Sequence, residues 1–237
     1  MQLYNAPWQS TNATDTTSTE QKELFHVLQD IEKKNERSAI NLVNALFLSS
    51  TSQSLDKVCF NIFAKIGDTR SLELVHKKFP SPHSISMSLV PSYIQVLSTL
   101  GGEDELELLA RVASVFGGLY RNELLDAFDK IIDRIGPISV NADVVEGLQK
   151  LFEATESSDK IRVLNIAQSL RNDLLHGLYI CGLESEAQEV RRFSITALGR
   201  LGTELSKRAL VRAFRNEYDD EVIPDFEPWI FPVTKVA

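Results

Sequence analysis

Histidines and cysteines are the residues of this chain best suited to bind a metal ion or to attack a substrate. No two of the four histidines stand four residues apart, so the chain lacks the paired histidines of a helical zinc site. The two cysteines fit buried, small apolar positions better than the role of ligand or nucleophile. We therefore predict no metal site and no catalytic thiol. These residues are His26, His76, His83, His176, Cys59 and Cys181.

Carboxylate pairs are the other groups whose spacing could support chemistry. Glu103 with Glu107, and Asp129 with Asp133, stand four residues apart. General acid catalysis needs one carboxyl group that is desolvated, and we expect these charged helix faces to be hydrated. The chain also lacks the G-x-S-x-G, P-loop and G-x-G-x-x-G motifs. The sequence thus predicts no catalytic residue, no cofactor and no enzymatic activity.

A repeated helical pattern must position any functional side chain. Six aliphatic residues recur at intervals of 35, 34, 35, 35 and 31 residues, and each has apolar residues four and three positions before it. Those offsets lie on one face of a helix, so each aliphatic residue is predicted to end an amphipathic helix. The six are Ile31, Ile66, Leu100, Ile135, Leu170 and Leu201.

Glycine follows four of these six residues and is expected to end the helix in a left-handed conformation. A second run of apolar residues with helical spacing follows each glycine, so the repeating unit is predicted to be a helical hairpin. A single hairpin cannot bury both of its apolar faces, whereas stacked hairpins can. We predict an all-α fold, a right-handed α-solenoid of about six hairpins over residues 20–216. The glycines are Gly67, Gly101, Gly136 and Gly202.

One unit matches a known repeat closely. The segment "EVRRFSITALGRLGTELSKRALVRAF", Glu189–Phe214, resembles a bacterial HEAT-type repeat in its Val-Arg-Arg opening, small first-helix residues, Leu-Gly turn and Ala-Leu core. The other units keep the aliphatic spacing but lack the paired arginines. The resemblance implies short HEAT-like repeats. Tetratricopeptide-like helices are the structural alternative, because the period is close to their 34 residues.

The segments between and beyond the hairpins differ in composition. We predict connecting loops at Lys77–Ser86, Phe116–Tyr120 and Gly136–Asp143, and a flexible N-terminal segment at residues 1–19. Residues 217–237 form an acidic and aromatic C-terminal tail. This tail either caps the last hairpin or docks in a groove of a partner as an extended peptide. Its candidate contact residues are Phe226, Trp229 and Phe231.

Charge and hydropathy restrict the possible partners. The chain has 25 Lys and Arg against 33 Asp and Glu, a net charge of -8, which disfavours nucleic acid as a partner. No apolar run is long enough to span a bilayer, and the first residues do not resemble a secretory signal. Two cysteines provide no disulfide framework. We expect a cytoplasmic protein that has no membrane partner.

The predicted architecture favours protein binding. In α-solenoids the second helix of each unit tends to line the concave face, where extended partners bind. We therefore expect a non-catalytic interaction module that scaffolds, adapts, regulates or inhibits another protein or a peptide, and the net charge favours a basic partner. The candidate partner-binding residues are Arg70, Glu73, Lys77, Glu107, Arg111, Glu146, Lys150, Asp173, His176, Arg208 and Arg212.

An enzymatic or nucleic-acid-linked function is the alternative. HEAT-like families include DNA base glycosylases and proteins that resemble bilin lyases, so the resemblance permits chemistry. A glycosylase would need a basic groove. Only the last hairpin is basic, with seven Lys or Arg and three acidic residues over residues 185–216.

Overall fold

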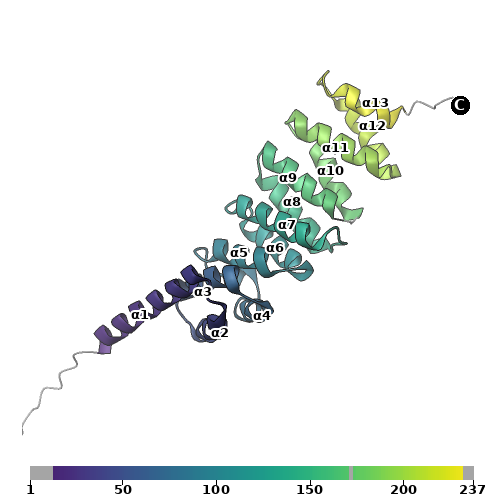
Figure 1. The fold of residues 1–237 in the computed structure, drawn as a ribbon. Helices are drawn as coiled ribbons and strands as arrows, with labels where there is room; N and C mark the ends of the chain where they lie inside the picture. The colour runs from purple at the N-terminus through teal and green to yellow at the C-terminus, as the bar shows by residue number, and fades with distance from the viewer. Residues whose placement is uncertain (1–12, 171–172, 232–237) are drawn as a thin grey trace, which may run out of the picture. The chain divides into compact units, whose positions relative to one another are not determined.

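The chain is helical throughout the part that the structure describes. This computed structural model describes residues 13–170 and 173–231, with the side chains of residues 22–170 and 174–231. Over these residues it contains thirteen α-helices and no β-strand (Figure 1). The predicted all-α fold is confirmed.

Two compact units make up the chain, Met1–Lys78 and Phe79–Ala237. The boundary between them lies inside the predicted loop Lys77–Ser86, where two prolines interrupt the helical pattern. The helices of the first unit are α1 (Ala13–Lys34), α2 (Ile40–Ser49), α3 (Gln53–Ile66) and α4 (Thr69–Lys78), with a short 3-10 helix at Arg37–Ala39.

The first unit has a small aromatic core. Helix α3 packs against α1 and α2, and α4 packs against α2. The ring of Phe47 lies 5.4 Å from that of Phe60 and 5.2 Å from that of Phe63, and all three side chains are fully buried. Lys78 closes this unit, because its ammonium group donates to the carbonyl oxygens of Phe47 and Ser50, at 2.7 and 2.8 Å, and forms an ion pair with Asp56.

In the second unit the helices follow one another in sequence order (Figure 1). Each packs against near neighbours in the chain, because α5 contacts α7, α6 contacts α8, α7 contacts α9 and α9 contacts α11. Gly147 permits the close approach of α6 and α8, since a Cβ atom there would collide with Ala110. The helices of this unit are α5 (Val90–Leu100), α6 (Glu103–Phe116), α7 (Arg121–Ile135), α8 (Ala142–Ala154), α9 (Ser157–Ser169), α10 (His176–Leu183), α11 (Gln188–Leu201), α12 (Glu204–Asn216) and α13 (Ile223–Ile230), with 3-10 helices at Pro82–Ser84 and Asp173–Leu175.

The predicted helix ends agree with the structure at most positions. Helices α3, α5, α7 and α11 end at the predicted aliphatic residues, and α9 ends one residue earlier, at Ser169. The exception is α1, which continues three residues beyond Ile31, to Lys34. The predicted loops Phe116–Tyr120 and Gly136–Asp143 also separate helices, α6 from α7 and α7 from α8.

The predicted left-handed glycine is correct at Gly202 and wrong at two other positions. Gly202 has a φ of 60° and a ψ of 12°, and Gly136 also has a positive φ, of 78°. Gly67 and Gly101 have extended conformations that any residue can adopt. At Gly101 glycine is needed for space, because a Cβ atom would collide with the carbonyl oxygen of Leu97.

Both chain ends contain helix where the sequence predicts a polar segment or a tail. Helix α1 begins at Ala13, inside the segment 1–19 that we expected to be flexible, and residues 1–12 lie outside the described residues. Residues 13–19 contain no large apolar side chain, so periodicity could not reveal this helix. Within the tail, α13 packs against α11 and α12, and residues 232–237 lie outside the described part.

Candidate functional site

The residues predicted to bind a partner are spread over five α-helices and one 3-10 helix, and several already contact each other. Glu107 and Arg111 of α6 form an ion pair, and Arg111 also contacts Asp143 at 3.2 Å. Asn141 donates to the other oxygen of Glu107 at 2.6 Å. This set therefore joins α6 to the start of α8.

The remaining predictions lie on other surfaces. Arg70, Glu73 and Lys77 are exposed on α4, in the first unit. On α8, Glu146 is exposed and Lys150 lies 4.0 Å from Glu153. The structure therefore brings only some of the predicted residues together.

Two predictions at the start of α10 do not describe an exposed site. His176 was expected to be exposed, and this is wrong, because only 8% of it is accessible. It lies on the buried face of α10 with Tyr179 and Leu183, which stand three and seven residues after it. The side chain of Asp173 lies outside the described residues.

A groove between α10 and α12 contains the last two predicted residues, Arg208 and Arg212. Its volume is about 430 Å³, and we call it the α10–α12 groove. Apolar side chains from both helices form its floor, and Leu205 remains 55% exposed. Leu205 is not among the partner-binding residues predicted from the sequence. The apolar floor consists of Ile180, Leu183, Leu205, Ala209 and Ala213.

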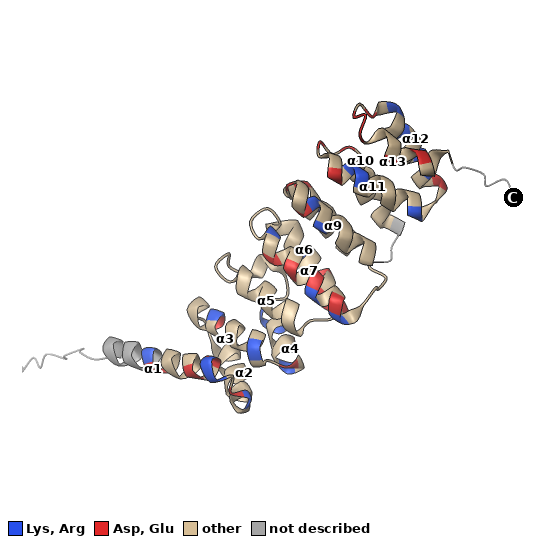
Figure 2. Ribbon diagram, turned by 45° about the horizontal axis from the view of Figure 1, so that its top comes forward, with Lys and Arg blue, Asp and Glu red and all other residues tan. Residues whose placement is uncertain are grey.

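The α12 side of this groove is basic. Arg208, Arg212 and Arg215 are exposed and form no ion pair with any described residue. Lys207 forms an ion pair with Glu204 of the same helix, at 3.0 Å. Figure 2 colours the Lys and Arg positions of the ribbon blue, including those on α12. The opposite side carries Glu184 and Glu186, so the groove has one basic and one acidic edge.

Arg191 fixes the end of the groove. It is 4% exposed and pairs with Glu217 at 3.0 Å and with Asp219 at 3.2 Å. The same guanidinium donates to the carbonyl oxygens of Ser185 and Glu186. Tyr218, which is 79% exposed, places its ring 5.4 Å from the Arg191 guanidinium carbon. Arg191 therefore joins the segment after α12 to the start of α11, and this holds the shape of the groove.

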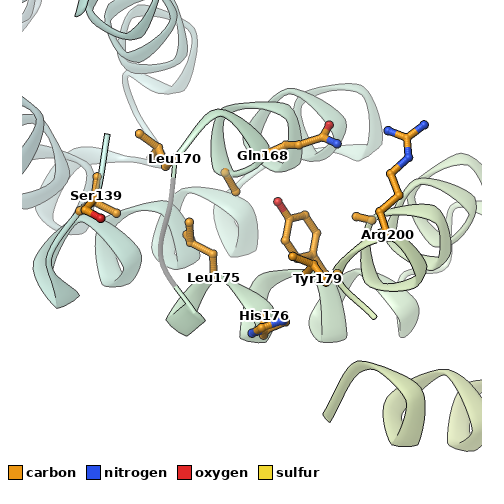
Figure 3. Close-up of a pocket in the computed structure, with 11 residues that line it drawn as sticks. Ser139, Gln168, Leu170, Leu175, His176, Tyr179 and Arg200 are labelled. Carbon is orange, nitrogen blue, oxygen red and sulfur yellow. The ribbon is translucent and has the colours of Figure 1, made fainter. Parts of the chain in front are cut away.

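The second unit has a further hollow, which we call the α9–α11 pocket. It has a volume of about 680 Å³ and lies where α9 and α11 end and α10 begins (Figure 3). Ser139 and Val140, from the segment between α7 and α8, also line it. The sequence analysis did not select Ser139 or Val140 as site residues. The remaining lining residues are Ala167, Gln168, Leu170, Leu175, His176, Tyr179, Ala197, Arg200 and Leu201.

The thiol groups differ in their surroundings. Cys59 is buried, as predicted, and burial with a nearby Asp56 raises the pKa of its thiol to about 12. Cys181 is exposed, so the predicted burial is wrong there, because it lies with Gly177 and Glu184 on the exposed face of α10. Its pKa is also raised, by partial burial and by the carboxylates of Glu184 and Glu153. A raised pKa lowers the thiolate fraction, which is the opposite of an activated nucleophile.

The described residues contain no group of three His, Cys, Asp or Glu placed to hold a metal ion. None of the helices in the described part of the chain has both the length and the apolar character needed to cross a bilayer. No protein-family model and no curated protein matches this sequence.

Proposed function

We propose that this protein is an interaction module that binds a segment of another protein in the α10–α12 groove. The observation that supports this most directly is the combination of an apolar floor, including the exposed Leu205, with Arg208 and Arg212, which have no ion-pair partner among the described residues. An exposed apolar residue beside unneutralised arginines suits a partner with an aliphatic anchor and acidic neighbours.

The architecture proposed for this module is a right-handed HEAT-like α-solenoid of six helical hairpins. The contacts that support it are those between alternate helices of the second unit, such as α5 with α7 and α6 with α8. In a solenoid each repeat contacts only its neighbours, and the second helices form the binding face. Helices α10 and α12 are second helices of adjacent proposed repeats, so the groove lies where a solenoid would bind its partner.

The class of partner follows from local rather than total charge. The net charge of -8 made us expect a basic partner. However, α12 contributes three arginines without an ion pair in the described structure. Long-range attraction acts on approach, whereas a bound segment responds to the side chains within a Debye length of about 8 Å. We therefore commit to an acidic, aliphatic segment, and a basic segment is an outcome of the test.

A peptide selection can test this proposal with the full-length protein. Short peptides from a random library would be selected for binding to the wild type and depleted against Arg208→Glu/Arg212→Glu. We expect the enriched peptides to combine Leu or Ile with Asp or Glu. The double variant should bind them at least about tenfold more weakly, a loss of about 1.4 kcal/mol. Lys130→Glu, an exposed charge reversal on α7, should leave binding unchanged.

Other outcomes would reject the acidic-segment proposal. Enriched basic peptides would restore the expectation of a basic partner, directed at Glu184 and Glu186. Equal binding by the wild type and the double variant would place the interaction elsewhere on the molecule. A mobility shift of duplex DNA that disappears in the double variant would favour the nucleic-acid alternative, because phosphate contacts depend on these same arginines.

A further inference from the structure

The α9–α11 pocket has the size and lining of a small-molecule site. Its volume of about 680 Å³ lies within the roughly 300–1,000 Å³ that is usual for such sites. Ala167, Leu170, Leu175 and Ala197 provide a buried apolar lining, and Leu201 extends it at 46% exposure. Sites of this kind combine an apolar lining with a few polar groups that orient the ligand.

Tyr179 supplies one such polar group. It is 4% exposed, and in Figure 3 its hydroxyl is directed from α10 toward α9, between Gln168 and Leu175. The hydroxyl forms no hydrogen bond with any described residue and is not sealed off from solvent, so a ligand in the pocket can reach it. Burial raises the pKa of Tyr179 to about 12, so at neutral pH this group is a hydrogen-bond donor without charge.

Arg200 supplies the charged group. It differs in its contacts from two other basic residues that are also penultimate in their helices. Arg134, the penultimate residue of α7, donates to the carbonyl oxygens of Thr99 and Ser98, which lie at the end of α5, at 2.9 and 3.1 Å. Lys65, the penultimate residue of α3, binds Glu32 of α1 at 2.8 Å. Each basic group thus contacts the helix two before its own, α5 for Arg134 of α7 and α1 for Lys65 of α3.

Arg200 is the penultimate residue of α11, but it makes no such contact. Its guanidinium forms no hydrogen bond or ion pair with any described residue, and it lies exposed at the pocket beside Gln168 of α9 (Figure 3). A guanidinium with its donors available next to an amide can bind a carboxylate at the mouth of the pocket.

We propose that the α9–α11 pocket binds a small carboxylic acid with an aliphatic body. The carboxylate pairs with Arg200 and accepts from the Gln168 amide, while the aliphatic body packs on Leu170, Leu175 and Ala197. The Tyr179 hydroxyl donates to a second oxygen atom carried on that body. This site is separate from the α10–α12 groove, because the two sets of lining residues do not overlap.

Calorimetric titration of the full-length protein tests this site with three probes that share one chain length: decanoate, 3-hydroxydecanoate and decan-1-ol. We expect one decanoate per chain and at least about tenfold weaker binding of the alcohol. Arg200→Gln should remove the preference for decanoate over decan-1-ol. Tyr179→Phe should weaken binding of 3-hydroxydecanoate and leave that of decanoate unchanged, since only the former offers the second oxygen.

The controls separate this site from the groove. Arg208→Gln removes a comparable exposed arginine and should leave all three affinities unchanged. Circular dichroism of Arg200→Gln and Tyr179→Phe should match the wild type, because one residue is exposed and the other change is nearly isosteric. Equal binding of decanoate and the alcohol, several molecules bound per chain, an unaffected Arg200→Gln variant, or no binding of any probe would each overturn the proposal.

Discussion

At the scale of single residues, two arginine ion pairs differ in how completely water is excluded. The side chains of Arg191 and Glu217 are 5% and 4% exposed. Arg162 pairs with Asp126 and Asp129 at 2.9 and 2.5 Å, but its side chain is 36% exposed. Removing a partner from a buried pair leaves a charge that water cannot reach, whereas an exposed charge is simply hydrated.

Arg191→Leu should therefore destabilise the protein far more than Arg162→Leu. We expect the free energy of unfolding to fall by about 3–5 kcal/mol for the first change and by no more than about 1 kcal/mol for the second. Urea titrations followed by circular dichroism measure both. Similar losses in the two variants would show that the Arg191 pair is not isolated from water.

Gly199 offers a second test, because a Cβ atom at this position would collide with the indole ring of Trp229. Gly199→Ala must displace that ring and should lower the free energy of unfolding by about 1–3 kcal/mol, with a shift in Trp229 fluorescence. Gly177→Ala on α10 is the matched control, since nothing lies within 4 Å of its added Cβ. Gly177→Ala should be neutral or stabilising by up to about 1 kcal/mol, because alanine favours helix.

The two cysteines should differ in reactivity. At pH 8 we expect iodoacetamide to label Cys181 slowly and to leave Cys59 unmodified until the protein is denatured, because Cys59 is buried and its pKa is about 12. Mass spectrometry of the native and denatured protein measures this. The burial of Cys59 also gives pH-dependent stability. Its pKa is raised from 9.0 in the unfolded chain, so its contribution is complete below pH 9 and is lost as the pH rises toward 12.

At the scale of elements, α13 shows how the tail associates with the last helices. Phe226 is 1% exposed, and its ring lies 5.8 Å from that of Phe214 on α12. Phe231 also lies near Phe214, at 6.0 Å, but remains 60% exposed. These contacts favour the interpretation of the tail as a cap, in which an apolar helix end is covered by the segment that follows it.

If the tail is a cap, Phe226→Ala should lower the free energy of unfolding by about 3–5 kcal/mol, because it empties a buried aromatic position. Phe231→Ala removes an exposed ring of the same type and should cost about 1 kcal/mol or less. Thermal unfolding of both variants, and of a chain that lacks residues 218–237, makes the comparison. An unchanged melting temperature in the truncated chain would favour the tail as a docking peptide.

At the scale of the whole molecule, each compact unit has its own buried residues. Phe47, Phe60 and Phe63 form the aromatic core of the first unit, whereas the second buries Tyr93, Phe128 and Phe226 among its own helices. A segment with its own hydrophobic core can fold alone.

We therefore expect residues 79–237 to fold without residues 1–78. The fragment should unfold cooperatively in urea, and its circular dichroism should be that of a helical protein. Its fluorescence reports on Trp229 alone, because the other tryptophan, Trp8, lies outside the fragment. A fragment that is helical but lacks a cooperative transition would show that its packing depends on the first unit.

The site was only partly predictable from the sequence. Arg208 and Arg212 followed from their helical position in a basic hairpin, and both line the α10–α12 groove. Arg111 was selected by the same argument, but Glu107 and Asp143 already neutralise it. Whether a charged residue is available to a partner depends on neighbours about 30 residues away, as with Asp143, and periodicity holds no information about them.

The sequence alone determined the helical class and most helix ends, because apolar spacing and glycine act within one or two turns of the chain. Only the tertiary structure decided that Leu205 is exposed, that His176 is buried and that Arg200 lacks the contact made by Arg134. These outcomes depend on how separate helices approach each other. The amphipathic pattern predicts which face of each helix is buried. The packing of neighbouring helices determines which residues of that face remain accessible.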